Sequence, residues 1–296
     1  MARRGAWRAV IPARTIVALA ATLVLASAAP AAAATHARPA VAALQVALRA
    51  KHLYAATVDG IPGPLTREAV RRFQARRGLV VDGIAGARTR AALGWRGRPR
   101  LRSRAITGGA RGWDVAALQF MLAAHGFPSG PFDGLLGPRG TDALRRFQAW
   151  AGLAADGVAG PATLAALRRA PPRSVLRFAA PVSGPTGDRF GPRGDAFHAG
   201  VDFPVPGGTP VRAAGGGCVS TIGWDPAGYG RYIVMSHRAG MTSLYAHLAA
   251  TTVRNGACVP TGARIGTVGA TGNATGPHLH FELRLRGALV DPLTGL

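Results

Sequence analysis

The chain has 296 residues, of which 48% are hydrophobic and 17% are charged, a balance that supports compact domains and excludes a disordered tail protein. Its formal net charge of +23 indicates an anionic partner. Aromatic residues make up only 6% of the chain and no basic stretch looks like a recognition helix, so we expect a cell wall or membrane surface and no nucleic acid as that partner.

The first 34 residues differ in composition from the rest of the chain. Arg3, Arg4 and Arg8 precede the apolar run TIVALAATLVLASAA, and small residues follow it. This order is typical of a secretory signal peptide, so we expect residues 1–34 to direct export and the protein to be secreted or associated with the cell wall. Because the apolar run approaches the length of a membrane span, an uncleaved N-terminal membrane anchor is the alternative.

The next part of the chain is duplicated. Residues 41–93 align with residues 115–167 without a gap, and many aligned positions are identical. Apolar residues at helical spacing, separated by D-G-x-x-G turns, predict three short helices in each copy, with Thr89 or Thr163 capping the third. The expected segments are a first module at 38–94, a basic linker at 95–111, a second module at 112–169 and a further linker at 170–180.

The order of motifs in both copies is L-Q-x-x-L, D-G-x-x-G, R-R-F-Q and D-G-x-x-G-x-x-T. This order resembles the peptidoglycan-binding-like module found on many wall hydrolases. The resemblance implies that the modules target peptidoglycan, and the positive charge adds anionic wall polymers as a further partner. The alternatives are that the modules are spacers or an inhibitory pro-region that covers the active site.

Residues 181–296 have a different sequence pattern. Short apolar runs such as CVSTIGW, YIVMSH and RIGTVGA are broken repeatedly by Gly and Pro, which predicts an all-β domain of antiparallel sheet. The expected fold is therefore multidomain, with two small three-helix α modules followed by this β domain. Its two cysteines, Cys218 and Cys258, have no metal-binding spacing, and in an oxidising compartment we expect them to form a disulfide.

Histidines lie on predicted strands of this domain. In HLHFELRL the residues alternate, so His278 and His280 project into one polar space while the leucines face the core. SLYAHLA alternates too, which predicts that His247 shares a polar face with Ser243 and Tyr245. Two histidines on one strand face can be a solvated surface as well as a site, so the neighbouring motifs decide.

The segment FHAGVDF places His198 four residues before Asp202, where Gly200 argues against a helix. In an extended segment this even separation keeps both side chains on one side. Histidine and aspartate are suitable zinc ligands, and a catalytic zinc site keeps one coordination position open. The residues therefore predict a shared metal site built from separate strands.

Three motifs in order, H-x-x-x-D in HAGVD, then YAHL, then H-x-H in TGPHLHFE, resemble a lysostaphin/LytM-type zinc metallopeptidase. The resemblance implies that one Zn²⁺ ion per chain is bound by His198, Asp202 and His280. It also implies that His247 and His278 are the catalytic histidines that act on the water and the transition state. Which of these two is the general base stays open.

One position departs from the pattern. Some members of that family carry a tyrosine shortly before the first zinc-binding histidine, where this chain has Arg193 as a candidate oxyanion or substrate contact. Glu282 is either a partner that orients a ligand imidazole or an exposed carboxylate. The remaining histidines are expected to lie outside the site: His36, His52, His125 and His237.

The combined expectation is an exported zinc endopeptidase that hydrolyses peptide bonds in peptidoglycan stem peptides or cross-bridges. The two modules would hold it on a substrate that cannot diffuse. The alternative is a non-catalytic wall-binding protein or amidase activator that keeps the peptidase fold. The sequence does not indicate which peptidoglycan bond is cut.

Overall fold

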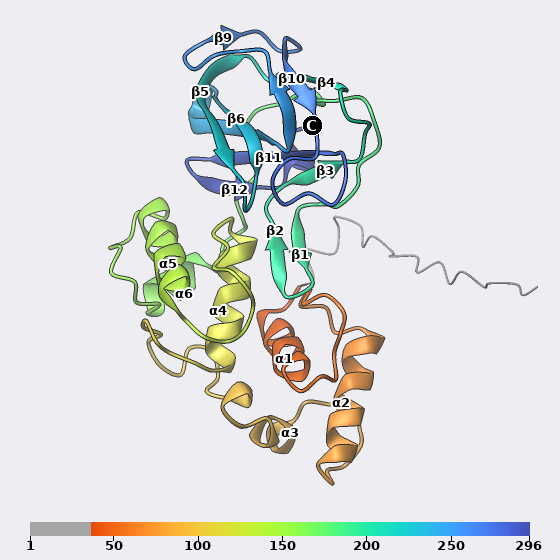
Figure 1. Ribbon diagram of the computed structural model, residues 1–296. Coiled ribbons are helices and arrows are strands. Elements are labelled where there is room, and N and C mark those ends of the chain that lie inside the picture. The colour runs from red at the N-terminus through yellow and green to blue at the C-terminus, as the bar shows by residue number, and fades with distance from the viewer. Residues whose placement is uncertain (1–36) are drawn as a thin grey trace, which may run out of the picture. The chain divides into compact units, whose positions relative to one another are not determined.

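Figure 1 shows the computed structural model of the chain, in which residues 37–296 are described. The segment predicted as a signal peptide, residues 1–34, lies outside the described residues. Helices occupy the N-terminal part and strands the C-terminal part, which confirms the predicted fold class. Within residues 37–296, no helix has both the length and the apolar character needed to cross a membrane.

Each copy of the duplicated segment folds into three helices, as predicted. Proline in the first turn starts four of the six helices, where its missing N–H leaves no hydrogen bond unmade. A short 3-10 helix, η2 (Gly94–Gly97), follows the third helix and spans the predicted boundary between the first module and the linker. The α-helices are α1 (Pro39–Arg49), α2 (Pro64–Arg76), α3 (Ala87–Ala92), α4 (Trp113–Ala124), α5 (Pro138–Trp150) and α6 (Pro161–Ala166).

Buried glutamines hold the D-G-x-x-G turns of the modules. The Nε2 group of Gln148 donates to Asp156 Oδ1 at 2.7 Å, to the Val158 carbonyl at 3.0 Å and to Thr163 Oγ1 at 3.1 Å. Its Oε1 accepts from the Gly157 N–H at 2.9 Å, so the whole turn closes around one amide. The other three turns are held in a similar way by the other three glutamines of the chain: Gln45, Gln74 and Gln119.

The predicted threonine caps are wrong. The helices α3 and α6 begin after Gly86 and Gly160, which have no side chain that could cap them. Thr89 and Thr163 lie inside these helices, and each hydroxyl accepts a hydrogen bond from a buried glutamine. The threonines therefore serve the turn network, because the glutamine amide needs an acceptor at that depth.

The two modules share apolar packing. One buried cluster contains Ala42 and Leu48 of α1 together with Ala116 and Phe120 of α4. A second cluster collects the remaining core of the second module around Phe147. Because the first cluster crosses the duplication, the first helices of the two copies pack against each other.

The β part is built from short antiparallel strands. The main sheet has the order β12-β11-β7-β6-β5-β9, with β3 also paired to β11. A second sheet has the order β4-β10-β8, and β1 and β2 form a hairpin. The strands are β1 (Gly191–Arg193), β2 (Ala196–His198), β3 (Val201–Phe203), β4 (Pro210–Arg212), β5 (Gly217–Asp225), β6 (Gly230–Ser236), β7 (Met241–Ala246), β8 (Leu248–Thr251), β9 (Cys258–Val259), β10 (Arg264–Val268), β11 (Leu279–Leu285) and β12 (Ala288–Val290).

Strand β11 is the centre of the β part. It pairs antiparallel with β3, β7 and β12, and its residues Leu279, Phe281 and Leu283 are fully buried in the apolar core. Because β-strand side chains alternate, the intervening residues all project to the other face of the sheet. That face carries the candidate site.

A disulfide joins β5 to β9, as predicted. Cys218 and Cys258 are directly opposite each other in this strand pair and are bonded through their sulfur atoms. The bond closes a loop whose ends are 40 residues apart in sequence. A crosslink of this kind stabilises a fold by restricting the unfolded chain.

The glutamine network generates a stability prediction. We expect Gln148→Leu to lower the free energy of unfolding by about 2 kcal/mol or more, because the Gly157 N–H and the Asp156 carboxylate lose their buried partner. Arg146→Leu, an exposed change in the same helix, should alter it by less than about 0.5 kcal/mol. Urea unfolding of both variants, monitored by circular dichroism, measures the difference. Equal unfolding midpoints for the two variants would contradict the role of the glutamine.

Candidate functional site

Strand β11 presents two histidines and a glutamate on one face, as the alternation predicts. His278 directly precedes the strand, and His280 and Glu282 follow at intervals of two residues. This face is not exposed to solvent, however, because His280 is only 6% exposed and Glu282 is fully buried. The two neighbouring strands and the loops around them therefore enclose a polar cluster.

Asp202 reaches the same cluster from β3. This strand pairs with β11 in a register that places Asp202 directly opposite His280. His198 ends β2 and enters from the hairpin, with Gly200 between the two strands. A side chain at Gly200 would collide with the Phe281 carbonyl, so glycine permits the close approach of this segment to β11.

Three atoms that can bind a metal ion lie close together at this point. Asp202 Oδ1 lies 2.8 Å from His280 Nδ1 and 3.2 Å from His198 Nε2, and the two imidazole nitrogens are 3.1 Å apart. Ligand atoms that sit about 2.0–2.1 Å from a tetrahedral zinc ion are separated by roughly 3.4 Å, so the spacing suits such an ion. Within residues 37–296, this is the group of histidine and carboxylate side chains that could hold a metal ion.

Hydrogen bonds fix which nitrogen of each imidazole faces the cluster. The Nδ1 atom of His198 lies 2.9 Å from the Arg189 carbonyl, which can only accept, so Nδ1 carries a proton and Nε2 is turned inward. In His280 the order is reversed, because Nε2 donates to the Glu282 carboxylate at 3.2 Å and leaves Nδ1 toward Asp202. Such outer partners orient metal-binding imidazoles.

The ionisation of the cluster follows from the same contacts. Burial opposes a charge on Asp202, but hydrogen bonds from His198 and His280 outweigh it and hold the pKa of this carboxyl well below its usual range. Burial also disfavours the His280 imidazolium, yet hydrogen bonds to Asp202 and Glu282 raise the pKa of His280 to about 9. A metal ion at Nδ1 would have to displace that proton.

His247 reaches the site through a backbone kink that the alternating sequence does not predict. Alternation predicts that it shares a face with Ser243 and Tyr245, but the structure contradicts this: Tyr245 is fully buried and packs on Phe281 in the core. The strand β7 ends at Ala246, and His247 adopts a left-handed backbone with φ of 60°. That kink turns its side chain to the opposite face, where the β11 histidines lie.

His247 and His278 lie side by side, next to the three metal-binding atoms. Their ring centroids are 4.6 Å apart, and His278 Nε2 lies 4.0 Å from Asp202 Oδ1. The Nδ1 atom of His247 donates a hydrogen bond to the Thr271 carbonyl, and that of His278 donates to the Gly276 carbonyl. The Nε2 atom of each ring is therefore free of its proton and can accept one. Burial lowers the pKa of His247, which favours its neutral form.

A buried network behind His280 was only partly predictable. Glu282 accepts hydrogen bonds from the Tyr229 hydroxyl at 2.6 Å and from Arg284 at 2.7 Å, besides the one from His280. Burial opposes ionisation of Glu282, but His280 and the Arg284 charge outweigh it and lower its pKa. The alternation that places Arg284 beside Glu282 was visible in the sequence, whereas Tyr229 lies on a separate turn and gave no signal.

Arg193 lies at the edge of the cluster. Its guanidinium is 3.1 Å from Asp188 and 3.7 Å from the second carboxylate oxygen of Asp202, and its side chain is 58% exposed. It can therefore meet a ligand from solvent. Of the histidines expected outside the site, His125 and His237 bond to other parts of the chain and His52 is exposed, while His36 lies outside the described residues.

The arrangement supports two kinds of chemistry. Three converging donors can hold a divalent metal ion, and two adjacent imidazoles with open Nε2 atoms can accept and release protons. Partial exposure of the Asp202 and His278 side chains leaves the cluster reachable from solvent.

Two protein families match separate parts of the chain. The family model described as "Peptidase family M23" matches residues 196–292, which contain the four histidines and two carboxylates of the cluster. The model described as "Putative peptidoglycan binding domain" matches residues 37–93 and 111–167, the two helical modules.

Similar proteins cover about a third of this chain. The DD-carboxypeptidase/endopeptidase Mpg of Neisseria meningitidis is 42% identical over 115 residues, which are 38% of this chain and 26% of that protein. The peptidoglycan DD-endopeptidase ShyA of Vibrio cholerae is 43% identical over 98 residues, 33% of this chain and 23% of that protein. The solved catalytic domain of the antimicrobial peptidase lysostaphin from Staphylococcus simulans is 34% identical, with 37% of this chain and 90% of that one covered and a TM-score of 0.37.

The match to these relatives is local, since the chain spans only 26% and 23% of the length of Mpg and ShyA. Residues 196–292 of this chain therefore belong to peptidase family M23, and residues 37–93 and 111–167 belong to the peptidoglycan binding domain family.

Proposed function

We propose that the protein is an exported zinc-dependent endopeptidase that hydrolyses peptide bonds in peptidoglycan. The observation that carries the proposal is the convergence of three metal-binding atoms with two imidazoles whose Nε2 atoms are open. Membership of residues 196–292 in peptidase family M23 supports the reaction class.

The proposed metal ligands are His198 through Nε2, Asp202 through Oδ1 and His280 through Nδ1. Two imidazoles and one carboxylate suit zinc, and three protein ligands leave the fourth tetrahedral position for water or substrate. When bound, zinc would polarise the scissile carbonyl and lower the pKa of a water molecule. The hydrogen bonds that His198 donates to the Arg189 carbonyl and His280 donates to the Glu282 carboxylate hold the two imidazoles in the tautomers that this binding requires.

The proposed proton carriers are His247 and His278. Within hydrogen-bond reach of the reacting water, an open Nε2 accepts a proton and later returns one to the leaving amine. The lowered pKa of His247 keeps it neutral and ready to accept a proton near neutral pH. Arg193, exposed beside Asp202, is the proposed contact for a substrate oxygen or carboxylate.

The proposed substrate is the peptide part of peptidoglycan. The two modules belong to a peptidoglycan binding family, and the similar proteins ShyA and Mpg are named as DD-endopeptidase and DD-carboxypeptidase/endopeptidase. A module that binds an insoluble polymer raises the effective concentration of the attached catalytic domain on it. Export through the segment at 1–34 would deliver the protein to that polymer.

A non-catalytic wall-binding protein or amidase activator is the competing reading. Such a protein does not require the metal site. The orienting hydrogen bonds on all four histidines of the cluster favour the catalytic reading, because a mere scaffold has no need for fixed tautomers.

The first activity prediction concerns the metal. We expect the purified full chain to release soluble peptides from peptidoglycan, and a chelator to abolish this release until zinc is restored. His280→Ala should lower the rate by at least about a thousandfold, because the zinc ion loses one of its three proposed ligands. Mass spectrometry of the released fragments measures the rate and identifies the bond.

The control is His52→Asn, a change at an exposed histidine whose φ of 56° asparagine tolerates. It should release fragments at the wild-type rate. Equal release by wild type and His280→Ala would contradict the catalytic proposal, and so would release that is insensitive to chelation.

A second prediction tests the network behind His280. We expect Glu282→Gln to weaken zinc binding about 10- to 100-fold, because the amide no longer orients Nε2 of His280 as a carboxylate does. Competition with a coloured chelator measures the affinity without reference to activity. Glu68→Gln, at the only other glutamate in the chain, is exposed and should leave the affinity unchanged. An unchanged affinity in Glu282→Gln would show that the carboxylate has no part in metal binding.

A further inference from the structure

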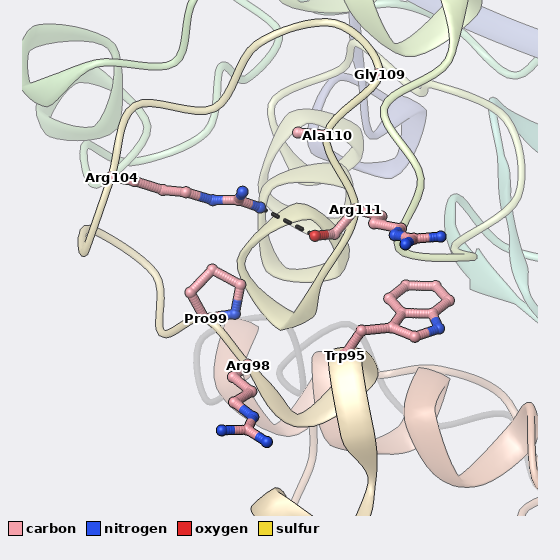
Figure 2. Close-up of a pocket in the computed structure, with 7 residues that line it drawn as sticks. All are labelled: Trp95, Arg98, Pro99, Arg104, Gly109, Ala110 and Arg111. Carbon is pink, nitrogen blue, oxygen red and sulfur yellow. Dashed lines mark hydrogen bonds between the residues drawn. The ribbon is translucent and has the colours of Figure 1, made fainter.

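A surface cleft in the segment predicted as a basic linker is lined by residues that include Trp95, Arg98, Arg104 and Arg111. Figure 2 shows the three guanidinium groups directed away from one another. Arg104 is already bonded to Asp114 and to the Arg111 carbonyl. These residues therefore present no convergent set of donors to a ligand.

The corner between β7 and β8 is built more closely, and it holds His247 in an unfavourable backbone conformation. A residue other than glycine rarely adopts a φ of 60°, and it does so only where its surroundings enforce it. The kink matters for the site, because it turns the imidazole to the face where the β11 histidines lie. Contacts from outside β7 and β8 must therefore hold this corner.

The segment 269–273, which follows β10, supplies such contacts through Thr271. The Thr271 carbonyl accepts the hydrogen bond from Nδ1 of His247 at 2.8 Å. The Thr271 hydroxyl donates to the carbonyl of Leu248, the residue after His247, at 3.0 Å. The same hydroxyl accepts a hydrogen bond from the Arg231 N–H of β6, also at 3.0 Å. Thr271 therefore connects the His247 ring and the adjoining backbone to a neighbouring strand.

The turn between β5 and β6 contacts the corner as well. A side chain at Gly230 would collide with the carbonyl and the hydroxyl of Thr271, so glycine permits this close approach. The carbonyl of Tyr229, the residue before it, accepts the hydrogen bond from the His247 N–H at 2.9 Å. The turn and the segment 269–273 therefore hold both the backbone and the ring of His247.

We infer that Thr271 is a positioning residue, whose hydroxyl fixes the corner so that the His247 imidazole lies beside His278 and the metal-binding atoms. The inference rests on the proposed function, in which His247 carries a proton. Because the single proton of the hydroxyl is donated to the Leu248 carbonyl, Thr271 has none to offer to a substrate. It acts through His247 and not on the reacting atoms.

The test compares three variants of the full chain. Thr271→Val removes the hydroxyl and keeps the branched shape, whereas Thr271→Ser keeps the hydroxyl. The matched control is Thr294→Val in the 3-10 helix η4 (Pro292–Thr294). The Thr294 hydroxyl also donates to a carbonyl, that of Asp291, and accepts from a backbone N–H, that of Ser174. Its removal should therefore lower stability without changing the site.

We expect Thr271→Val to lower kcat for soluble cross-linked muropeptides about ten- to a hundredfold, because a displacement of about 1 Å strongly impairs a catalytic group. KM should stay within about threefold of wild type, since the variant alters no proposed metal ligand or substrate contact. Thr271→Ser should recover kcat to within about threefold, because the hydroxyl again has both partners. Thr294→Val should keep the wild-type kcat.

A second measurement depends neither on a metal ion nor on turnover. In zinc-free protein with isotope-labelled histidine, NMR signals of the ring nitrogens show which nitrogen carries the proton, and the variant His247→Asn identifies the His247 signals. At mildly alkaline pH, wild type and Thr294→Val should show a single tautomer of His247 with the proton on Nδ1, because that proton is donated to the Thr271 carbonyl. Thr271→Val should show a mixture of both tautomers.

A wild-type kcat in Thr271→Val would overturn the inference, and so would an equal loss in Thr294→Val or the absence of recovery in Thr271→Ser. A single Nδ1–H tautomer of His247 in Thr271→Val overturns it in every case. If wild type fails to hydrolyse muropeptides, the proposed function fails, and a tautomer mixture confined to Thr271→Val still supports the positioning of His247. If Thr271→Val does not fold, Thr271→Ala takes its place with the same expectations.

Discussion

The contact between Asp202 Oδ1 and His280 Nδ1, at 2.8 Å, is the interaction on which the candidate active site depends. It exists because β3 and β11 pair in a register that sets these two residues opposite each other, with Gly200 allowing the hairpin to bring in His198. Three electron-rich atoms so close together are unfavourable without a proton or a cation between them. The raised pKa of His280 shows that the cluster favours a bound proton. The proposed zinc ion would replace this proton and bind all three atoms.

Much of the fold followed from periodicity and turn chemistry. The constant spacing of the duplicated copies predicted six helices, and the frequent Gly and Pro residues predicted the antiparallel β part, both of which the structure confirms. The pairing of Cys218 with Cys258 was also correct. The sequence was less informative about single residues of the modules. Thr89 was predicted to cap a helix, but its hydroxyl accepts a hydrogen bond from Gln74, fifteen residues earlier in the chain.

The site was predictable where a strand was regular and unpredictable where the backbone departed from it. Alternation placed His278 and His280 together correctly. It also predicted a polar face shared by His247, Ser243 and Tyr245, which is wrong because Tyr245 lies in the core and a left-handed residue at His247, which an alternating pattern does not reveal, turns this side chain to the other face. The sequence also did not show which polar residues are buried. Glu282 could be interpreted as an exposed carboxylate, but it is fully buried, and Tyr229 from a distant turn and Arg284 on the same strand hold it beside His280.

The most direct test of this account is the identity and position of the metal ion in a crystal of the full chain. Anomalous diffraction on both sides of the zinc absorption edge should give one peak about 2.1 Å from His198 Nε2, Asp202 Oδ1 and His280 Nδ1. His247 and His278 should lie near this peak without binding it. The absence of a zinc peak after growth in zinc, or a peak held by a different set of side chains, would contradict the account.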